Sequence, residues 1–294
     1  MPKAAAREPK EGEAQEDGAK DRQFVTALAR GLEILRCFSL NRREMTTVEI
    51  AAMTGLPQPS VWRLSHTLIE CGYLLSDPAS RKLSVGPAVL ALGFAALGNL
   101  GFADAVNPYL RRIAERFGGA ASLGLRERDG VLLLQRWQAE TMLTLNLSAG
   151  STVSLSRSAI GWAHLAALTE KERAKLLAEL KVAEQEGGPR LLEDIARAMA
   201  DYARDGFVVN CGKSQALING VSVPLRVPGR RTVYLLGCAG AATDFTEAKI
   251  RAEVGPALRD MAAELSVLIG DITAASGPAS GDMADVRRPL ARRK

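Results

Sequence analysis

The 294-residue sequence contains few of the residues from which metal centres and nucleophilic active sites are most often built. It has two histidines and four cysteines, and no two cysteines show CxxC or another metal-ligand spacing. We therefore expect neither a metal site nor a cofactor. The four cysteines are interpreted as small core residues in a reducing compartment, with redox sensing as the alternative. They are Cys37, Cys71, Cys211 and Cys238.

Sequence motifs of the common enzyme classes are also missing. The chain has no GxGxxG after a predicted strand, no Walker loop, no HExxH and no GxSxG. His164 stands in an Ala- and Leu-rich segment, where a hydrogen-bonded core histidine is a simpler interpretation than a general base. Two carboxylates can still come together in the folded chain, which leaves acid–base catalysis open. We expect a protein that is not an enzyme.

The sequence has no run of about 18 uncharged apolar residues, so a membrane span is not expected. Residues 1–23 mix Lys, Glu and Ala and lack the apolar segment of a secretory signal. The protein is therefore expected in the cytoplasm, without a membrane partner. Residues 1–22 and 273–294 offer almost nothing to bury and are expected to be disordered tails, the second one basic.

The remaining composition is that of an ordinary soluble globular protein, with 47% hydrophobic and 24% charged residues. A chain of this length predicts about two domains. The net charge of +5 favours a nucleic-acid partner only weakly and does not establish one.

The N-terminal part predicts a helix-turn-helix. An amphipathic helix is expected first, from apolar residues at helical spacing: Val25, Leu28, Leu32, Leu35 and Phe38. A capping-box pattern from Thr46 to Glu49 then opens a short helix that ends at Gly55. After Pro57 a second helix is expected to run to about Cys71, with Gly72 as its C-cap. Two short helices joined by a tight Gly-containing turn are typical of this motif.

A hairpin follows the second helix. Short strands are expected over Tyr73–Leu75 and Lys82–Val85, on either side of the turn-rich loop 76–81. A hairpin in this position predicts the wing of a winged helix-turn-helix.

Polar side chains on the outer face of the second helix are candidates for contact with double-stranded DNA. Arg63 can form two hydrogen bonds with guanine or bind a phosphate, and Gln58 can pair with adenine. The alternative is a solvated helix face. Trp62 and His66 are expected to pack or to position the helix on phosphates. The predicted DNA-binding residues are Thr47, Gln58, Ser60, Arg63, Thr67, Arg81 and Lys82.

The C-terminal part predicts an α+β domain with a largely antiparallel sheet. An apolar linker helix over residues 87–101 is expected to pack against a partner. Strands are expected over 121–125, 131–138, 143–147, 207–209, 220–225 and 232–238. Helices are expected from about 103 to 117 and over 158–168, 170–180, 191–204 and 246–269, the last bent near Pro256. The predicted domains are 23–86, 87–101 and 102–272.

Several segments together resemble the IclR family of bacterial transcriptional regulators. Thr47–Leu64 resembles the DNA-binding helices of that family, and 72–74 with 83–86 resembles its wing and linker entry. Ser158–Ala163 resembles the start of a helix in its effector domain. Later segments match the family's strands in order: 206–209, 220–224 and 237–240. The resemblance spans about Phe24 to Gly270.

This resemblance implies a GAF-like effector domain and a homo-oligomer, either a dimer or a dimer of dimers. It also implies a small-molecule effector and an operator near catabolic genes. We expect a pseudo-palindromic operator and dimerisation through the first helix and the linker helix. The alternative is a winged-helix protein whose C-terminal domain only oligomerises.

The sequence departs from the family pattern at the implied effector site. Family members commonly have a basic residue where Trp162 stands. Members that bind small acids tend to have an acidic residue, a cysteine and serines at the positions of Asn210, Gly220, Gly237 and Ala239. A site with these smaller side chains is expected to be larger and to prefer an aromatic or bulky effector. The predicted effector-binding residues are Trp137, Arg157, Trp162, Asn210, Gly220, Gly237, Cys238 and Ala239. Trp137 and Trp162 are equally compatible with ordinary core positions.

Overall fold

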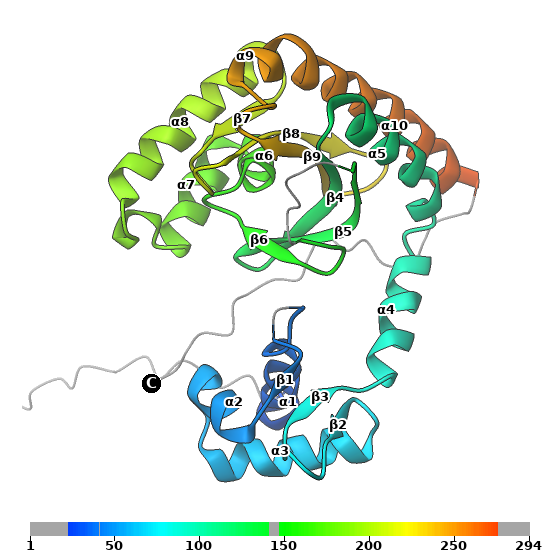
Figure 1. Cartoon of the computed structure of the whole chain (residues 1–294), viewed down its shortest axis with the longest axis vertical. Coiled ribbons are helices and arrows are strands. Elements are labelled where there is room, and N and C mark those ends of the chain that lie inside the picture. Colours follow the sequence, from blue (N-terminus) through cyan, green and yellow to red (C-terminus); the bar gives the residue numbers. More distant parts are fainter. Residues whose placement is uncertain (1–22, 41, 141–146, 276–294) are drawn as a thin grey trace, which may run out of the picture. The chain divides into compact units, whose positions relative to one another are not determined.

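The computed structural model describes residues 23–40, 42–140 and 147–275 (Figure 1). The chain divides into two compact units between Leu90 and Ala91, and each is described by itself. Both expected tails lie outside the described residues, except that 273–275 continue the last helix. Most of the strand expected over 143–147 lies outside them as well.

The N-terminal unit consists of three helices and a small antiparallel sheet. Its elements are α1 (Thr26–Arg36), β1 (Glu44–Met45), α2 (Thr47–Thr54), α3 (Gln58–Glu70), β2 (Leu74–Ser76) and β3 (Leu83–Val85). The strand order is β1-β3-β2. The expected helix-turn-helix and its hairpin are present, and β1, which the sequence did not indicate, pairs with β3.

Local hydrogen bonds define the helix-turn-helix. The Thr46 backbone N–H donates to a Glu49 carboxylate oxygen at 2.7 Å, and the Glu49 N–H donates to the Thr46 hydroxyl at 3.3 Å. The predicted capping box is thus confirmed, and its hydrogen bonds lower the pKa of Glu49. Gly55 ends α2 at a φ of 68°, in the left-handed region that favours glycine.

The apolar residues of α1 divide between two environments. Ile34 and Gly31 are buried, whereas Val25, Leu28 and Leu32 are exposed. The helix carries two apolar stripes, and only the one with Ile34 packs into the core of the N-terminal unit. That core also contains Cys37, Met45, Ile50, Val61, Leu74 and Leu83.

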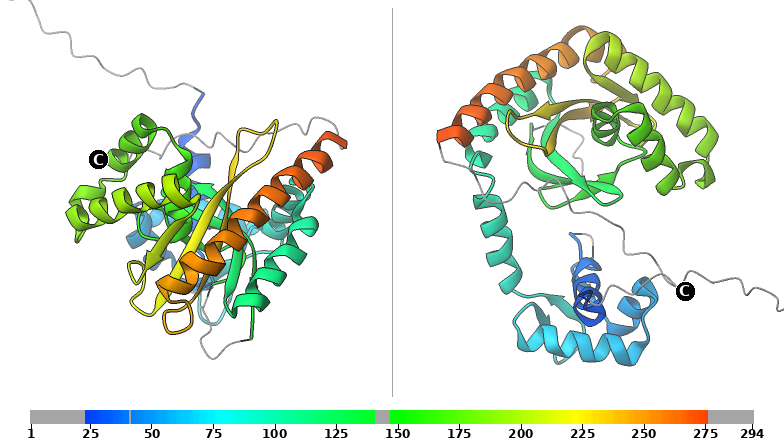
Figure 2. Two further views of the ribbon diagram at one scale, coloured as in Figure 1. Left: turned by 90° about the horizontal axis from the view of Figure 1, so that it is seen from above. Right: turned by 180° about the vertical axis from the view of Figure 1, so that it is seen from behind.

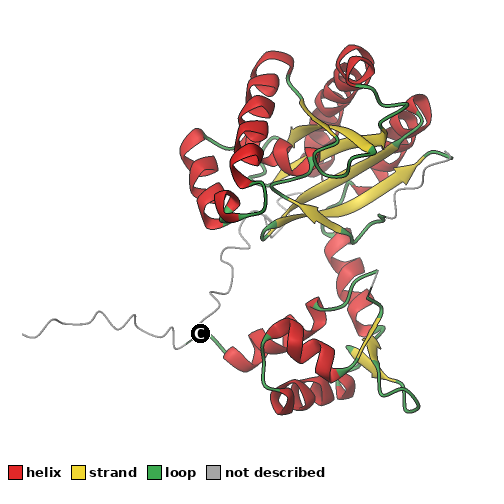
Figure 3. Ribbon diagram, turned by 60° about the vertical axis from the view of Figure 1, so that its left-hand side comes forward, coloured by secondary structure: helices red, strands yellow, loops and turns green. Residues whose placement is uncertain are grey.

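The C-terminal unit is a six-stranded antiparallel sheet covered by helices on both faces. The strands are β4 (Ala120–Glu127), β5 (Gly130–Gln138), β6 (Thr152–Ser154), β7 (Val208–Cys211), β8 (Ile218–Arg226) and β9 (Val233–Ala241). Their order is β6-β5-β4-β9-β8-β7, with β6 not indicated by the sequence. The helices are α5 (Ala103–Phe117), α6 (Ala159–Ala167), α7 (Glu170–Glu179), α8 (Gly188–Asp205) and α10 (Gly255–Ala275). This confirms the predicted α+β fold class (Figure 3).

Each face of this sheet has its own hydrophobic core. On one face α5 and α10 cover side chains such as Leu123, Val221 and Leu236. These two helices lie side by side (Figure 2), and Arg112 of α5 pairs with Glu264 of α10 at 3.0 Å. On the other face α6, α7 and α8 cover a second core. Because successive residues of a strand point to opposite faces, each strand side chain belongs to one core or the other.

The last helix is interrupted rather than simply bent. A short α9 (Glu247–Lys249) leads into a π-helical segment, Ile250–Val254, and α10 begins at Gly255. Pro256 is the second residue of α10, which continues from the π-helical segment without a break. Because proline has no N–H, one carbonyl oxygen of the preceding turn lacks its helical hydrogen bond, and the wider π-helical turn lies at this point.

The helix α4 (Ala88–Gly98) lies across the division between the units and has no buried residue. Leu90, Leu92 and Phe94 are 62%, 58% and 69% exposed. Among the described residues, no single helix is long and apolar enough to span a membrane. Of the described helices, only α4 and α5 taken as a pair are long and apolar enough, and the chain bends by 85° at the break between them.

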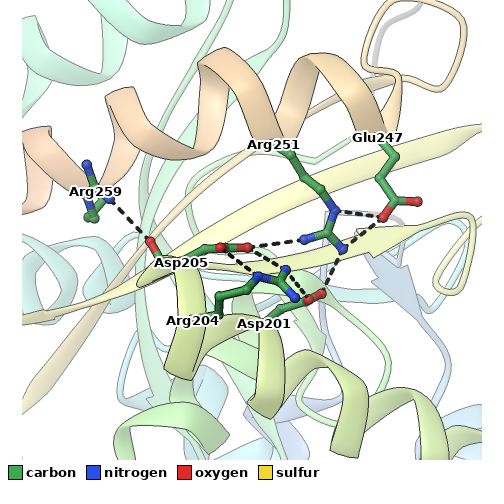
Figure 4. A network of polar contacts seen from close by, with 6 residues as sticks. All are labelled: Asp201, Arg204, Asp205, Glu247, Arg251 and Arg259. Atoms are coloured by element: carbon green, nitrogen blue, oxygen red, sulfur yellow. Dashed lines mark hydrogen bonds and ion pairs between the residues drawn. The ribbon is translucent and has the colours of Figure 1, made fainter.

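A network of ion pairs joins the end of α8 to the last helical segments (Figure 4). The Arg251 guanidinium lies 2.9 Å from an Asp201 oxygen, 3.3 Å from an Asp205 oxygen and 2.8 Å from a Glu247 oxygen. Arg204 binds the same two aspartates, each at 2.7 Å, and lowers the pKa of Asp205. Exposed ion pairs stabilise little individually, but these pairs share their charges and connect the end of α8 to α9 and the π-helical segment.

His164 is buried in α6 without a hydrogen bond on either ring nitrogen. The expectation of a hydrogen-bonded core histidine is therefore wrong about its partners. Burial lowers the pKa of His164 to about 4, and the positive charges of Arg126 and Arg226 add to the effect. The imidazole is neutral in the folded chain at neutral pH.

Acid should therefore destabilise the chain through His164. The unfolded imidazole has a pKa near 6.5, so between pH 6.5 and 4 the unfolded state binds more protons and stability falls as pH falls. Below pH 4 the free energy of unfolding is lowered by the full amount, about 3 kcal/mol, and above pH 7 it is not lowered. Denaturant titrations of wild type and His164→Leu across this range measure it. If the free energies of unfolding of the two proteins changed with pH in parallel, His164 would not be the group responsible.

Candidate nucleic-acid interface and ligand site

The outer face of α3 carries most of the side chains predicted to contact DNA. Gln58, Arg63 and Thr67 are exposed, whereas Val61 and Ser65 are buried on the opposite side. Pro57 and Pro59 stand at the start of the helix, where no helical N–H is required. Arg63 therefore projects from a helix whose orientation is set by buried side chains.

Two of the residues predicted to contact DNA are less accessible at the surface. Ser60 is half-buried in the first turn of α3, and Thr47 is half-buried at the start of α2. The Thr67 hydroxyl donates to the Arg63 carbonyl oxygen at 3.2 Å, which occupies its proton within the helix. Arg63 and Gln58 are thus the freest polar groups of the predicted set on α3.

Trp62 and His66 form a second feature of this face. Their rings are stacked, with centroids 5.8 Å apart and an interplanar angle of 7°, and Trp62 is 61% exposed. Because both side chains are exposed, they do not pack into the core, and their positioning of the helix on phosphates stays a prediction. Their i, i+4 spacing beside Arg63 was the sequence signal for a shared outer face.

The wing loop between β2 and β3 is ordered by one carboxylate. Asp77 accepts hydrogen bonds from the backbone N–H groups of Ala79 and Ser80, each at 3.1 Å, and from the Ser80 hydroxyl at 2.5 Å. These bonds lower the pKa of Asp77. Arg81 follows at a φ of 58° and is exposed. Lys82 lies 3.7 Å from Glu44 of β1, so its charge is partly compensated within the unit.

In the C-terminal unit, the sheet register brings three of the predicted effector residues into one row. Asn210 is opposite Gly220, and Gly220 is opposite Ala239. The row continues through Ala120 to Gln138 of β5. All five residues of this row lie on the α6 face of the sheet, because the alternate residues of these strands lie in the core under α5 and α10.

The adjacent row contains residues that the sequence did not single out. Ser222 is opposite Gly237, Gly237 is opposite Ser122, and Ser122 is opposite Arg136. An Arg136 Nη donates to the Ser122 hydroxyl at 3.5 Å, and the other donates to the Gln138 side-chain oxygen at 2.8 Å. The alternation of β5 was the available signal, but the bulge between Leu123 and Gly124 changes its register.

The glycines of these rows do not leave empty space. A Cβ at Gly220 would lie 3.4 Å from the Ala159 Cβ, and one at Gly237 would lie 3.4 Å from Ile160 and 2.8 Å from the Ser222 hydroxyl. The expectation that small residues here enlarge a cavity is therefore wrong, since α6 approaches the sheet instead. Ala239, Gln138 and Arg136 keep partly accessible surfaces.

Asn210 and Arg157 are used mainly within the fold. The Asn210 side-chain amide donates to the Arg157 carbonyl oxygen at 2.9 Å, and its oxygen accepts the Lys213 N–H at 3.1 Å. The Arg157 guanidinium donates to the Glu186 carbonyl oxygen at 2.6 Å. Asn210 thereby links β7 to the segment that begins α6.

Three predicted effector residues lie elsewhere, because neighbouring strand residues face opposite sides. Trp137 points toward α5, where the Arg111 guanidinium lies 5.3 Å from its ring centroid. Cys238 is buried in the core under α5 and α10, and burial raises its pKa to about 12. Trp162 is buried in the core around α6 and donates its indole N–H to the Ser156 carbonyl oxygen at 2.6 Å. The core interpretation thus holds for Trp162, whereas Trp137 is 38% exposed and belongs to neither core.

Among the described residues, no group of three His, Cys, Asp or Glu side chains lies close enough to hold a metal ion. Of the four cysteines, Cys37 and Cys238 are buried, Cys211 is half-buried and Cys71 is exposed.

The chain was compared with known proteins. The IclR helix-turn-helix domain matches residues 27–78, and the bacterial transcriptional regulator IclR C-terminal domain matches residues 94–267. The HTH-type transcriptional regulator TsaQ1/TsaQ2 of Comamonas testosteroni is 33% identical over 82% of this chain and 87% of its own length.

Two solved structures are similar to this fold. An IclR-family regulator from Brucella abortus superposes with a TM-score of 0.76 and 35% identity, over 87% of this chain and 96% of its own. An IclR homologue from Microbacterium hydrocarbonoxydans, complexed with 4-hydroxybenzoate, has a TM-score of 0.67 and 20% identity, over 84% of this chain and all of its own.

A winged helix-turn-helix followed by an α+β domain of this topology defines a DNA-binding transcriptional regulator with a ligand-binding domain. The chain belongs to the IclR family of bacterial transcriptional regulators. Its relatives are regulators and not enzymes.

The hydrogen bonds of Asp77 lead to a prediction about the wing. Asp77→Ala removes the acceptor for two backbone N–H groups, so the amides of Ala79 and Ser80 should exchange with solvent faster, roughly fivefold or more for about 1 kcal/mol per lost bond. Amide exchange followed by NMR measures this. Asp77→Asn keeps one acceptor oxygen in place of two, so it should retain protection at only one of these two amides. Equal exchange in Asp77→Ala and wild type would contradict the role of the carboxylate.

Proposed function

We propose that this protein is a cytoplasmic homo-oligomer that binds a pseudo-palindromic operator and controls a catabolic operon in response to an effector. Residues 23–86 form its DNA-binding domain, 87–101 its linker helix and 102–272 its effector domain. The observation that carries the DNA-binding part is the exposed Arg63 on a capped helix, followed by a wing that presents Arg81.

On DNA, α3 lies in the major groove and the wing contacts the phosphate backbone. Arg63 and Gln58 reach base edges or phosphates, and Arg81 and Lys82 bind phosphates. Thr47, Ser60 and Thr67 support these contacts from the helix ends. The exposed Trp62 adds an apolar surface next to Arg63, suited to a thymine methyl group or a deoxyribose.

Dimerisation through α1 and α4 accounts for two exposed apolar surfaces. Val25, Leu28 and Leu32 are exposed on α1, and Leu90 and Phe94 are exposed on α4. Contiguous apolar side chains on a soluble protein commonly mark an interface. A two-fold dimer places two recognition helices in half-sites about one helical turn, or a multiple of it, apart.

An aromatic or similarly bulky compound is the proposed effector, bound at the α6 face of the sheet around Ala239. Asn210 already uses its side chain within the fold, so a two- or three-carbon acid would find few anchors there. A larger ligand can bury apolar area against Ala239 and the start of α6, at roughly 25 cal/mol per Å². The 4-hydroxybenzoate complex of the Microbacterium homologue supports a ligand of this size.

Removal of Arg63 and Arg81 should weaken binding to the operator and reduce its salt dependence. Each lost phosphate contact lowers the slope of log K against log salt by roughly one unit. Fluorescence anisotropy of Arg63→Ala/Arg81→Ala on operator DNA from 50 to about 200 mM salt measures both quantities. Arg111→Ala/Arg112→Ala, on α5 of the C-terminal unit, is the control with the same loss of charge. Unchanged affinity and an unchanged salt slope in the double variant would show that this surface does not bind DNA.

Aromatic acids should stabilise the full chain more than small acids do. A ligand present at 100 times its Kd stabilises by about 2.7 kcal/mol, which raises Tm by roughly 5–10 °C for a domain of this size. Thermal melts with benzoate and 4-hydroxybenzoate are compared with melts in glyoxylate and pyruvate. A shift with the two small acids alone would overturn the proposed size preference.

A further inference from the structure

The centre of the outer face of α3 is shared by Arg63 and His66, which are both exposed. Four side chains of this helix are buried or packed against the core of the N-terminal unit: Val61, Leu64, Ser65 and Leu68. At about 100° per residue, the direction opposite these four lies between Arg63 and His66, roughly 30° from each. Trp62 lies about 70° from that direction, on the side of His66. His66 is therefore as central as Arg63 on the surface proposed to enter the major groove.

The imidazole of His66 is held by the indole of Trp62. The two rings are stacked, with centroids 5.8 Å apart and an interplanar angle of 7°. Residues four apart on a helix are neighbours on its surface, so both rings extend from the same side of α3. Because one face of the imidazole lies against the indole, rotation of the ring about its Cβ–Cγ bond is restricted. A side chain that is ordered in advance loses less conformational entropy when it binds.

The hydrogen-bonding groups of His66 are not used within the described part of the chain. No hydrogen bond or ion pair joins its ring nitrogens to another described residue, and the edge that carries both nitrogens is free. The neighbouring Thr67 differs, since its hydroxyl donates to the Arg63 carbonyl oxygen at 3.2 Å. His66 therefore presents a polar ring edge that is both oriented and unoccupied.

The exposure of Trp62 indicates a surface that a partner covers. Its side chain is 61% exposed, although a tryptophan ring has a large apolar area to bury. The ring lies against His66 on one face and is open to solvent elsewhere. Tryptophan is enriched at interfaces, because its ring is mostly apolar and carries one polar group. Two exposed, stacked rings on a recognition helix are therefore suited to contact with base edges.

We propose that His66 reads a purine of the operator through a hydrogen bond from its imidazole N–H to the N7 atom, in the orientation that Trp62 imposes. This rests on the proposed DNA-binding function and assigns His66 to base recognition instead of phosphate contact. N7 is the major-groove acceptor that adenine and guanine share. The imidazole carries at least one N–H whether it is neutral or protonated, so the donor is present in both states. His66 is thus a specificity-determining residue, and Trp62 is its positioning residue.

The test removes the N7 atom from the DNA. The operator is first selected from a randomised duplex library with the full chain. Each purine of one half-site is then replaced by its 7-deaza analogue, in which a C–H group stands in place of N7, and fluorescence anisotropy measures the affinity for each duplex. One replacement should weaken wild-type binding roughly three- to tenfold, the loss expected for one hydrogen bond. The same replacement should have no effect on His66→Ala, because the bond that it removes is already absent.

Further variants test the stack and the specificity of the effect. Trp62→Ala removes the support of the imidazole and should reduce the sensitivity to the 7-deaza purine, whereas Trp62→Phe keeps a stacked ring and should retain most of it. Glu70→Gln is the matched control, since Glu70 is exposed one turn farther along the same face of α3. This variant should keep the wild-type sensitivity. The comparison of natural and 7-deaza operators with the wild-type chain does not depend on the folding of any variant.

The outcomes distinguish the His66 contact from the proposed function. If the wild-type chain selects no duplex over random DNA, both are overturned. If an operator is selected but no purine shows a sensitivity that depends on His66, the base contact is overturned and DNA binding stands. A His66→Ala variant that binds every duplex more weakly by the same factor, with its 7-deaza sensitivity intact, overturns base reading in favour of a phosphate contact.

Two results with the other variants would also contradict the proposal. Full sensitivity in Trp62→Ala would overturn the positioning role of Trp62. Loss of the sensitivity in Glu70→Gln as well as in His66→Ala would overturn the base contact, since the effect would not be specific to His66.

Discussion

The close approach of α6 to the sheet is the contact on which the C-terminal unit depends. Gly124, Gly220 and Gly237 present only backbone to this helix, and Ile160 lies against two of them. Gly161 allows the same closeness on the helix itself, because a Cβ there would overlap the Leu155 carbonyl oxygen. Any larger residue would push α6 away from the sheet. With the helix fixed in this way, the accessible part of the sheet face lies around Ala239, Gln138 and Arg136.

The positive charges on that face have different environments. Burial lowers the pKa of His164 and keeps it neutral, and the charges of Arg126 and Arg226 add to this effect. Arg136 lies on the same face of the sheet beside hydroxyl and amide groups. An effector acts on DNA binding only through different affinities for two arrangements of the protein.

The DNA-binding unit shows a different balance between local and tertiary interactions. Its capping box, the left-handed Gly55 and the Asp77 turn are made within a few residues, and each could be found in the sequence. The face of α1 that packs into the core could not be found in the sequence. Two apolar stripes on that helix are equally hydrophobic, and only packing against the neighbouring helices decides that Ile34 is buried and Leu28 exposed. The exposed stripe then becomes part of the proposed interface between copies.

The sequence by itself determined the helix-turn-helix, its caps, the wing hairpin, most strands and the family, because these follow from short-range spacing and backbone preference. Only the tertiary structure decided which predicted effector residues share a surface. Strand side chains alternate between two buried faces, so a one-residue difference in register separates Gly237 and Ala239 from Cys238, and Arg136 from Trp137. The bulge in β5, where the extra residue Leu134 stands opposite the step from Leu123 to Gly124 of β4, has no signal in composition or periodicity. For the same reason Arg136 was not found from the sequence.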